Sequence, residues 1–264
     1  MDIIHLSDLH FGNDHAPFNE RELSDGLSKY IVSQTENPIV ILSGDITIQG
    51  KKEGYPIATT FVNNLLSAGQ VSRNHLCFCP GNHDIVEGGF KSFDTFVYGA
   101  RRDRQLDFDN GSCKILEIQD TVFVILNSSF HLDHRYGLIE EGSLNVDLSQ
   151  YDKDKKRVLI FHHHILNQFD GDTSAIRNSY DLVQFIEKNE FCLVLHGHQH
   201  TEQHYHVGKK ATPVVSARSS NFSQLGYLNA FNHYKITDED ISFESLVFER
   251  SSKGICIKNL GRQF

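Results

Sequence analysis

The chain has 264 residues, 39% of them apolar, and a formal net charge of −9. This length predicts one large domain, 1–264, that can bury a core without disulfides or structural metals. The acidic balance argues against a protein that tracks a nucleic-acid backbone, although a local basic groove would remain compatible with it.

Features that would place the chain in a membrane or outside the cell are not found in the sequence. A membrane-spanning helix needs a run of about 18 or more apolar residues, and no such run occurs. The opening MDIIHLSDLH lacks a basic stretch followed by an apolar one, so we expect no signal peptide. The cysteines are odd in number and form no Cys-x-x-Cys pair, which predicts reduced thiols and a cytoplasmic location. They are Cys77, Cys79, Cys113, Cys192 and Cys256.

Short apolar runs alternate with helix-like stretches along the first two thirds of the chain. This alternation predicts βαβ units and a largely parallel sheet. We expect helices from about Phe18 to Ser33, from Tyr55 to Ala68 and from Tyr180 to Lys188. The expected strands are Ile3–Leu6, Ile39–Leu42, Leu76–Cys79, Val122–Leu126, Val158–Phe161 and Leu193–Leu195.

Two other stretches differ from this pattern. The stretch Lys91–Asp109 is rich in Arg, Asp and Phe and shows no clean period, so we interpret it as a loop or cap near the functional site. The last third predicts consecutive strands and a second, more antiparallel sheet packed on the first. We therefore expect an α/β fold of two packed mixed sheets with helices outside. The late strands are Gln203–Val207, Thr212–Val215, Tyr227–Ile236 and Ile241–Phe248.

Polar residues that can bind metal ions follow five of the expected strands. Loops at the carboxyl ends of strands are where α/β sheets build their sites, so these residues predict one convergent site. Their oxygen and imidazole donors, without a cysteine, suit Mn, Fe or Zn. Seven candidate ligands are too many for one tetrahedral ion and suit two divalent ions that share a carboxylate. They are Asp8, His10, Asp45, Asn82, one of the three histidines His162–His164, His198 and His200.

The order D-x-H, G-D, G-N-H-D, H and G-H-x-H, from Asp8 to His200, resembles that of the calcineurin-like metallophosphoesterases. The resemblance implies a four-layer αββα fold and hydrolysis of a phosphate ester by a hydroxide that bridges two metal ions. It implies that His83 assists the phosphate or protonates the leaving group and that Asp84 orients His83. One ion would be bound by Asp8, His10, Asp45 and His200, and the other by Asp45, Asn82, His198 and one histidine of the triplet, where we favour His162 over His163.

Within the family, S-D-L-H-F-G together with G-D-I-T-I-Q-G resembles the cyclic-nucleotide phosphodiesterase branch. The resemblance implies a small phosphodiester substrate, with a phosphomonoester as an alternative. A DNA nuclease of the same fold is a second alternative, which the acidic charge and the absence of tryptophan disfavour. A non-catalytic interaction scaffold is a third, which the complete set of ligand types disfavours. A protein phosphatase is disfavoured because no arginine neighbours the G-N-H-D motif.

Overall fold

Two mixed β-sheets form the centre of the molecule in the computed structural model, which describes residues 1–252 and 254–260. Each sheet has six strands in the described residues. The strands are β1 (Asp2–Leu6), β2 (Ile39–Ser43), β3 (Leu76–Cys79), β4 (Cys113–Ile118), β5 (Thr121–Leu126), β6 (Lys156–Ile160), β7 (Leu193–His196), β8 (His204–Val207), β9 (Thr212–Ser216), β10 (Ala230–Ile236), β11 (Ile241–Ser251) and β12 (Gly254–Asn259).

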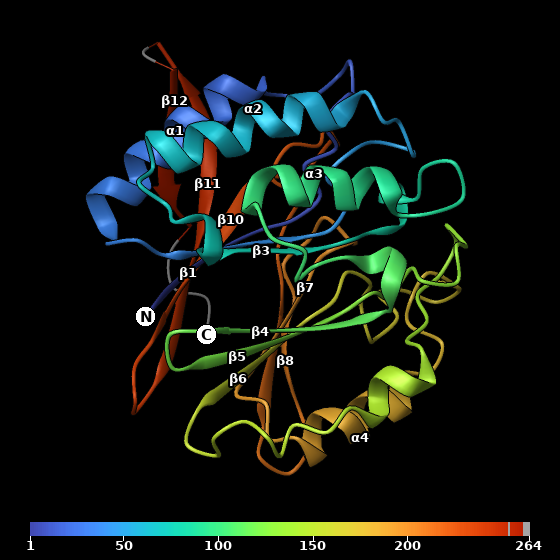
Figure 1. The fold of residues 1–264 in the computed structure, drawn as a ribbon. Helices are drawn as coiled ribbons and strands as arrows, with labels where there is room; N and C mark the ends of the chain where they lie inside the picture. Colours follow the sequence, from blue (N-terminus) through green and yellow to red (C-terminus); the bar gives the residue numbers. More distant parts are fainter. Residues whose placement is uncertain (253, 261–264) are drawn as a thin grey trace.

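The first sheet has the strand order β12-β11-β10-β1-β2-β3, and the second has the order β4-β5-β6-β7-β9-β8. Helices α1 (Glu20–Gln34), α2 (Gly54–Ser67) and α3 (Lys91–Arg101) lie outside the first sheet, and α4 (Ser179–Lys188) lies outside the second (Figure 1). The expected α/β fold of two packed mixed sheets flanked by helices is therefore confirmed, with four layers in the order αββα.

The hydrophobic core lies between the two sheets and continues under the helices. Along β5, Phe123 and Ile125 belong to the cluster shared with the first sheet, while Val124 belongs to a second cluster with Leu182 and Phe185 of α4. Because strand side chains alternate between faces, a strand covered on both faces needs apolar residues at nearly every position. This explains why the expected strands read as continuous apolar runs.

Helix α1 begins directly after the capping residue Asn19. The Asn19 side chain accepts a hydrogen bond from the Glu22 N–H (2.9 Å), and the Glu22 side chain accepts one from the Asn19 N–H (3.3 Å). This reciprocal pair satisfies main-chain donors that the first turn leaves free. The helix therefore starts at Glu20, two residues after the expected Phe18.

The stretch Lys91–Asp109 is largely helical, and so is not the loop that was one of the two structures expected from its composition. Helix α3 occupies residues 91–101 and packs against α2 and β3. Its buried residues Phe93, Phe96, Val97 and Ala100 follow the three- and four-residue spacing of one helix face. This period is short, and the charged residues from Arg101 to Asp109 that follow it hid it in the sequence.

The C-terminal strands do not form a separate antiparallel sheet, so this expectation was wrong. Strands β8 and β9 extend the second sheet, whereas β10, β11 and β12 extend the first. Strand β10 pairs antiparallel with β1, with Asp2 opposite Lys235, and β1 also pairs in parallel with β2. Each sheet thus combines a parallel part with an antiparallel part.

In the part of the chain that the structure describes, no helix combines the length and the apolar character that crossing a membrane requires.

Candidate metal centre

The seven predicted ligands lie in loops at the carboxyl edges of both sheets. Five of them have a positive φ, from 46° at His10 to 78° at His198. Residues other than glycine rarely adopt this left-handed conformation, and such residues cluster at functional sites. The main chain is therefore strained where these side chains converge. Asp8 and His10 follow β1, Asp45 follows β2, Asn82 follows β3, His162 follows β6, and His198 and His200 follow β7.

Asp8, His10 and His200 form the first group of candidate ligands. The His200 Nε2 atom lies 3.0 Å from His10 Nε2 and 3.3 Å from Asp8 Oδ1. Burial disfavours ionisation of Asp8, but the hydrogen bond and charge of His200, with the charge of His162, outweigh it and hold the pKa of Asp8 below its usual range. The group therefore combines an ionised carboxylate with two imidazoles, a donor set that suits a divalent cation.

Asp45, His162 and His198 form the second group. The His162 Nε2 atom lies 3.3 Å from both Asp45 Oδ2 and His198 Nδ1. The His162 Nδ1–H donates to the Ser43 carbonyl oxygen (2.7 Å), which leaves Nε2 free to act as a ligand. Burial lowers the pKa of His162, but the adjacent Asp45 carboxylate outweighs it and raises this pKa to about 9. The surroundings thus favour a positive charge at this point.

Asp45 connects the two groups. It also belongs to a third group with His10 and His83, whose candidate donor atoms all lie within 4.8 Å of one another. The buried Oδ1 atom of Asn82 has no hydrogen-bond partner among the described residues, while that of Asp8 contacts His200 Nε2 (3.3 Å). A buried oxygen without a partner is costly unless a cation or water satisfies it. The donor set therefore fits two neighbouring divalent ions with Asp45 between them.

The three consecutive histidines of the triplet have different surroundings. Only His162 belongs to one of the groups above. The His163 Nδ1 atom pairs with Ser128 Oγ (2.8 Å), and its ring packs on that of His198 with centroids 4.4 Å apart. The His164 Nε2 atom lies 2.8 Å from Asp172 Oδ2. Of the two ligand choices left open by the sequence, the structure therefore places His162, and not His163, beside Asp45.

His83 is held by the loop that follows Asp45. Its Nδ1 atom accepts a hydrogen bond from the Gln49 N–H (2.8 Å), and its carbonyl oxygen accepts one from the Gly50 N–H (2.9 Å). Because Nδ1 is an acceptor, the ring hydrogen of the neutral side chain lies on Nε2. The Nε2 atom lies 4.0 Å from Asp45 Oδ2 and so faces the centre.

Asp84 is fully buried and bonds to main-chain groups. Its carboxylate accepts hydrogen bonds from the N–H groups of Gly81 (2.9 Å), Ile46 (3.1 Å) and Thr47 (3.2 Å). Burial and the charge of Asp45 raise the pKa of Asp84 to about 7, against these hydrogen bonds. Asp84 thus joins the loops after β2 and β3, whereas the contact that holds the His83 ring comes from Gln49.

Two contributors to the site escaped the sequence analysis. The first is the Gln49 main chain, since a backbone N–H leaves no mark in a sequence. The second is Phe222, whose ring centroid lies 4.6 Å from that of His200 and 4.9 Å from that of His10. Phe222 lies in the loop after β9, and β9 runs parallel to β7. Its place after a strand at the carboxyl edge of the sheet is the one feature that could have indicated a contact with the site.

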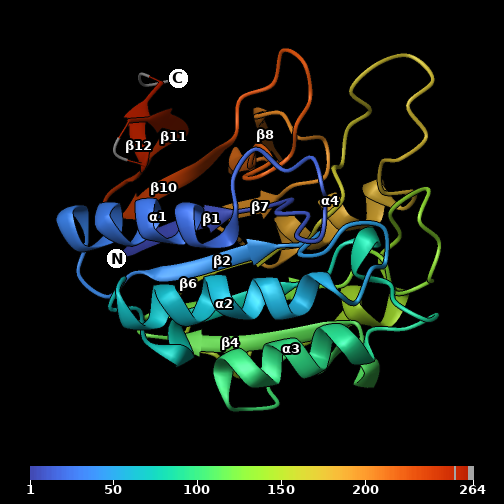
Figure 2. The same ribbon diagram turned by 90° about the horizontal axis from the view of Figure 1, so that it is seen from above.

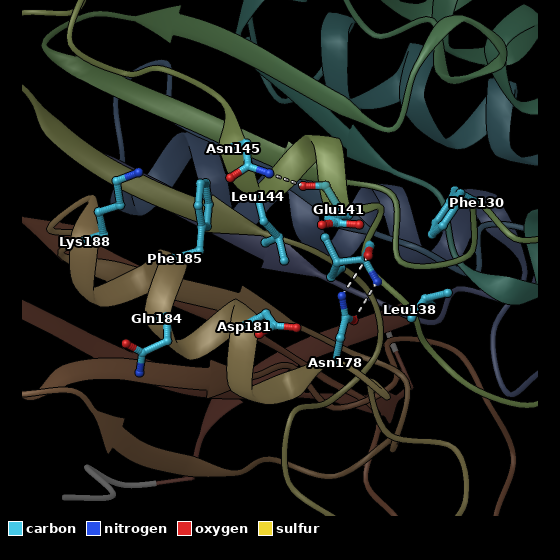
Figure 3. Close-up of a pocket in the computed structure, with 11 residues that line it drawn as sticks. Phe130, Leu138, Glu141, Leu144, Asn145, Asn178, Asp181, Gln184, Phe185 and Lys188 are labelled. Atoms are coloured by element: carbon cyan, nitrogen blue, oxygen red, sulfur yellow. Dashed lines mark hydrogen bonds between the residues drawn. The ribbon is translucent and has the colours of Figure 1, made fainter.

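A separate cavity lies between α4 and the short helix η4 (Glu141–Asn145) (Figure 3). Its volume is about 570 Å³, and its lining includes Phe130, Leu144 and Phe185. Asn178 closes one side, because its side chain bonds to the N–H (3.0 Å) and the carbonyl oxygen (2.8 Å) of Ile139. None of the predicted ligands is among the described residues that line this cavity, so it is distinct from the candidate metal centre.

Comparison with known families and structures agrees with this geometry. The family model described as calcineurin-like phosphoesterase matches residues 1–202. A dimetal phosphatase from Danio rerio is 13% identical with a TM-score of 0.69, over 100% of this chain and 99% of that one. No curated protein sequence matches this chain significantly.

Two longer proteins contain a domain of the same fold. A purple acid phosphatase from yellow lupin seeds is 14% identical with a TM-score of 0.63, and the match covers 94% of this chain and 51% of that one. A 5'-nucleotidase precursor from Thermus thermophilus is 11% identical with a TM-score of 0.51, over 94% of this chain and 54% of that one. This chain therefore spans about half the length of these two proteins. At such low identity, the likeness establishes the fold.

Proposed function

This chain belongs to the calcineurin-like phosphoesterase family, and on that premise we propose that it hydrolyses a small phosphodiester with two divalent metal ions. The observation that carries the proposal is the position of Asp45. This residue belongs both to the group with His162 and His198 and to the group with His10 and His83. One carboxylate shared by two clusters of ligands is the arrangement that a dinuclear centre requires.

The proposed ligands follow from the two groups. Asp8, His10, Asp45 and His200 would bind one ion, and Asp45, Asn82, His162 and His198 would bind the other. The unpartnered Oδ1 atom of Asn82 supports this assignment, as does the hydrogen bond that leaves His162 Nε2 free. When bound, such ions supply Lewis acidity and lower the pKa of a water nucleophile.

His83 would act on the substrate phosphate or on the leaving group. The Gln49 N–H occupies Nδ1, so the neutral ring presents its Nε2–H toward the centre. From there the neutral ring can donate a hydrogen bond to a phosphoryl oxygen. Transfer of a proton to the departing alkoxide would require the doubly protonated ring, whose Nδ1–H no longer accepts the Gln49 N–H. The Gln49–Gly50 turn holds both the ring and the carbonyl of His83, and this fixes the direction of the donated hydrogen.

The experiment that tests the proposal uses protein stripped with EDTA and supplied with Mn²⁺, Zn²⁺, Fe²⁺ or Mg²⁺ one at a time. We expect the added metal to restore hydrolysis of bis-p-nitrophenyl phosphate in preference to p-nitrophenyl phosphate. Preference for the monoester would instead support the phosphomonoesterase alternative. Cleavage of a single-stranded oligonucleotide under the same conditions would support the nuclease alternative.

Replacing the shared carboxylate separates a dinuclear centre from a single-ion site. We expect Asp45→Asn to bind less than half of the wild-type metal and to lose at least about 100-fold in activity, which corresponds to about 2.7 kcal/mol of transition-state stabilisation. Metal content by mass spectrometry and the rate of diester cleavage measure this. Asp120→Asn is the matched control, because Asp120 is an exposed carboxylate at the amino end of β5. Near-wild-type activity of Asp45→Asn would rule out the assignment.

A further inference from the structure

Large apolar side chains are exposed on three loops at the carboxyl edges of the sheets. Exposed fractions range from 42% at Leu132 to 100% at Leu225. Four other large apolar residues with comparable exposure in the described chain lie on α1, α3, α4 and after β12, each in a different place. We call the set on the three loops the apolar rim: Leu132 after β5, Leu166 and Phe169 after β6, and Leu225 and Leu228 after β9.

Figure 2 shows the green and yellow loops on the side of the molecule toward which β2 points, and the orange loop rising near the middle of the view, above the tip of β2. Strands β5, β6, β7 and β9 run parallel to one another, so the loops after β5, β6 and β9 leave the same edge as the loop that carries His198 and His200. The apolar rim and the candidate metal centre therefore share one edge of the fold.

Each of the three loops contacts the candidate metal centre directly or through the next residue. In the loop after β5, the His134 carbonyl accepts a hydrogen bond from the Asn82 side chain (3.3 Å). In the loop after β6, the Gln168 side chain donates to Thr201 Oγ1 (2.8 Å), next to His200. In the loop after β9, the Phe222 ring packs on the rings of His10 and His200. The rim residues lie one to six positions from these contacts in the sequence.

Cationic side chains on the same loops are already engaged. Residues 127–138, 161–178 and 217–229 contain no lysine and three arginines. Arg135 pairs with Asp133 (2.6 Å), Arg218 lies 3.8 Å from Glu202, and Arg177 lies over the Tyr136 ring (4.8 Å). A substrate with further phosphates, or a nucleic-acid backbone, would find few free cations here, whereas an apolar group would find exposed apolar surface.

From these observations we infer that the substrate is a phosphate ester with an apolar alkyl or aryl group, bound as a single dissolved molecule (a monomeric ester) and not from an aggregate or a lipid surface. The apolar group packs on the apolar rim while the phosphate lies at the metal centre. The inference rests on the proposed function. Burial of apolar surface supplies the affinity for this group, and the Phe222 ring, which packs on His10 and His200, adds aromatic surface beside the first group of ligands.

A series of ethyl, butyl, hexyl and octyl p-nitrophenyl phosphate diesters tests the inference. The leaving group is constant, so differences in kcat/KM report on the alkyl chain. Complete burial would raise kcat/KM about fourfold per methylene group, and we expect about twofold for chains that lie on an open rim. All esters are kept below the concentration at which they aggregate. Equal kcat/KM along the series would overturn the inference and leave the proposed function intact.

Variants test whether the apolar rim causes the dependence of kcat/KM on the length of the alkyl chain. We expect Phe169→Ser combined with Leu225→Ser to reduce the gain per methylene group to near onefold. Val32→Ser combined with Tyr98→Ser is the matched control, because these residues are exposed apolar positions on α1 and α3. A dependence on chain length that persists in the rim variant would place the apolar group elsewhere.

Binding provides a readout that does not depend on turnover. Octylphosphonate and methylphosphonate are titrated into Mn²⁺-loaded protein in a calorimeter. Tighter binding of octylphosphonate to the wild type than to the rim variant, without hydrolysis of any ester, would support the rim and contradict the proposed function. Equal binding of both phosphonates would overturn the inference. Activity that begins only where the esters aggregate would show recognition of a lipid surface, and this also overturns the inference of a monomeric ester.

Discussion

Glycines at the candidate metal centre are required by close approach of neighbouring atoms. A Cβ atom at Gly197 would lie 2.7 Å from Asp8 Oδ2, and one at Gly81 would lie 2.9 Å from the Asp45 carboxylate carbon. Both distances are shorter than ordinary van der Waals contact. At Gly81 the atoms that would have to move belong to the proposed ligand Asp45, and at Gly197 they belong to Asp8 and to its neighbour Ser7, whose Oγ is nearer still. The G-N-H-D and G-H-x-H motifs therefore need glycine for the position of the carboxylates as much as for the turn.

The substitution Gly197→Ala tests this at the scale of one methyl group. We expect it to displace the Asp8 carboxylate, to lower the metal content, and to reduce the free energy of unfolding by about 1–3 kcal/mol through overpacking. Mass spectrometry of the purified protein and urea denaturation measure the two effects. Gly142→Ala is the control, since a Cβ at Gly142 meets no atom within 4 Å. Unchanged metal content in Gly197→Ala would show that the loop adapts without moving Asp8.

At the scale of the element, α3 contains a glycine that its helix does not need. Gly99 lies within Lys91–Arg101, and a Cβ there meets no atom within 4 Å. Glycine in a helix interior loses more backbone entropy on folding than alanine does. The residue therefore weakens a helix whose buried face is otherwise well formed.

We expect Gly99→Ala to raise the free energy of unfolding by about 0.5–1 kcal/mol. Urea denaturation measures the change, provided that the slope of unfolding free energy against urea concentration is the same in both proteins. Gly88→Ala is the matched control with the opposite sign, because Gly88 also has open space around it but has a φ of +77°. Alanine there would be strained and should destabilise the protein. A loss of stability in Gly99→Ala would mean that α3 is held by packing that the added methyl disturbs.

Elements with a clear apolar pattern could be predicted from the sequence, and those whose pattern depends on distant partners could not. Helices α1, α2 and α4 begin within two residues of their expected starts. Strands β4 and β12 were missed, since their partly exposed residues alternate weakly and their positions depend on pairing with β5 and β11. The assignment of β8 to β12 to two sheets is likewise a property of the folded chain.

The side chains of the candidate site that belong to motifs could be predicted from the sequence, and its other contributors could not. Asp8, Asp45 and His198 stand in recognisable motifs after apolar runs. Phe222 carries no such mark, because an aromatic residue in a loop is ordinary until the fold brings it against His200. The role of Gln49 lies in its main chain, which any residue other than proline could supply.

At the scale of the whole molecule, the candidate metal centre joins the two sheets. Asp8, Asp45 and Asn82 come from loops of the first sheet, whereas His162 and His198 come from loops of the second. Ions bound by both sets would hold the carboxyl edges of the sheets together. Ligands that bind only the folded state also stabilise it by mass action.

We therefore expect metal removal to destabilise the entire domain rather than a single loop. At a free Mn²⁺ concentration about 100 times the dissociation constant, the gain in unfolding free energy is about 2.7 kcal/mol per ion. Thermal unfolding of EDTA-stripped protein, with and without Mn²⁺, measures this. The gain should shrink in Asp45→Asn and persist in Asp120→Asn. An unfolding temperature that does not respond to Mn²⁺ would contradict a link between the sheets.

The pairing of β1 with β10 sets an order of events during synthesis. Asp2 lies opposite Lys235, so β1 needs a neighbour that is translated more than 200 residues after it. Until then β1 can pair with β2 alone, and its other edge stays open to other chains. Long-range pairing of this kind is slow, and unpaired edges in partly made chains promote aggregation. The first sheet of this phosphoesterase therefore cannot be completed until β10 has been translated and can pair with β1.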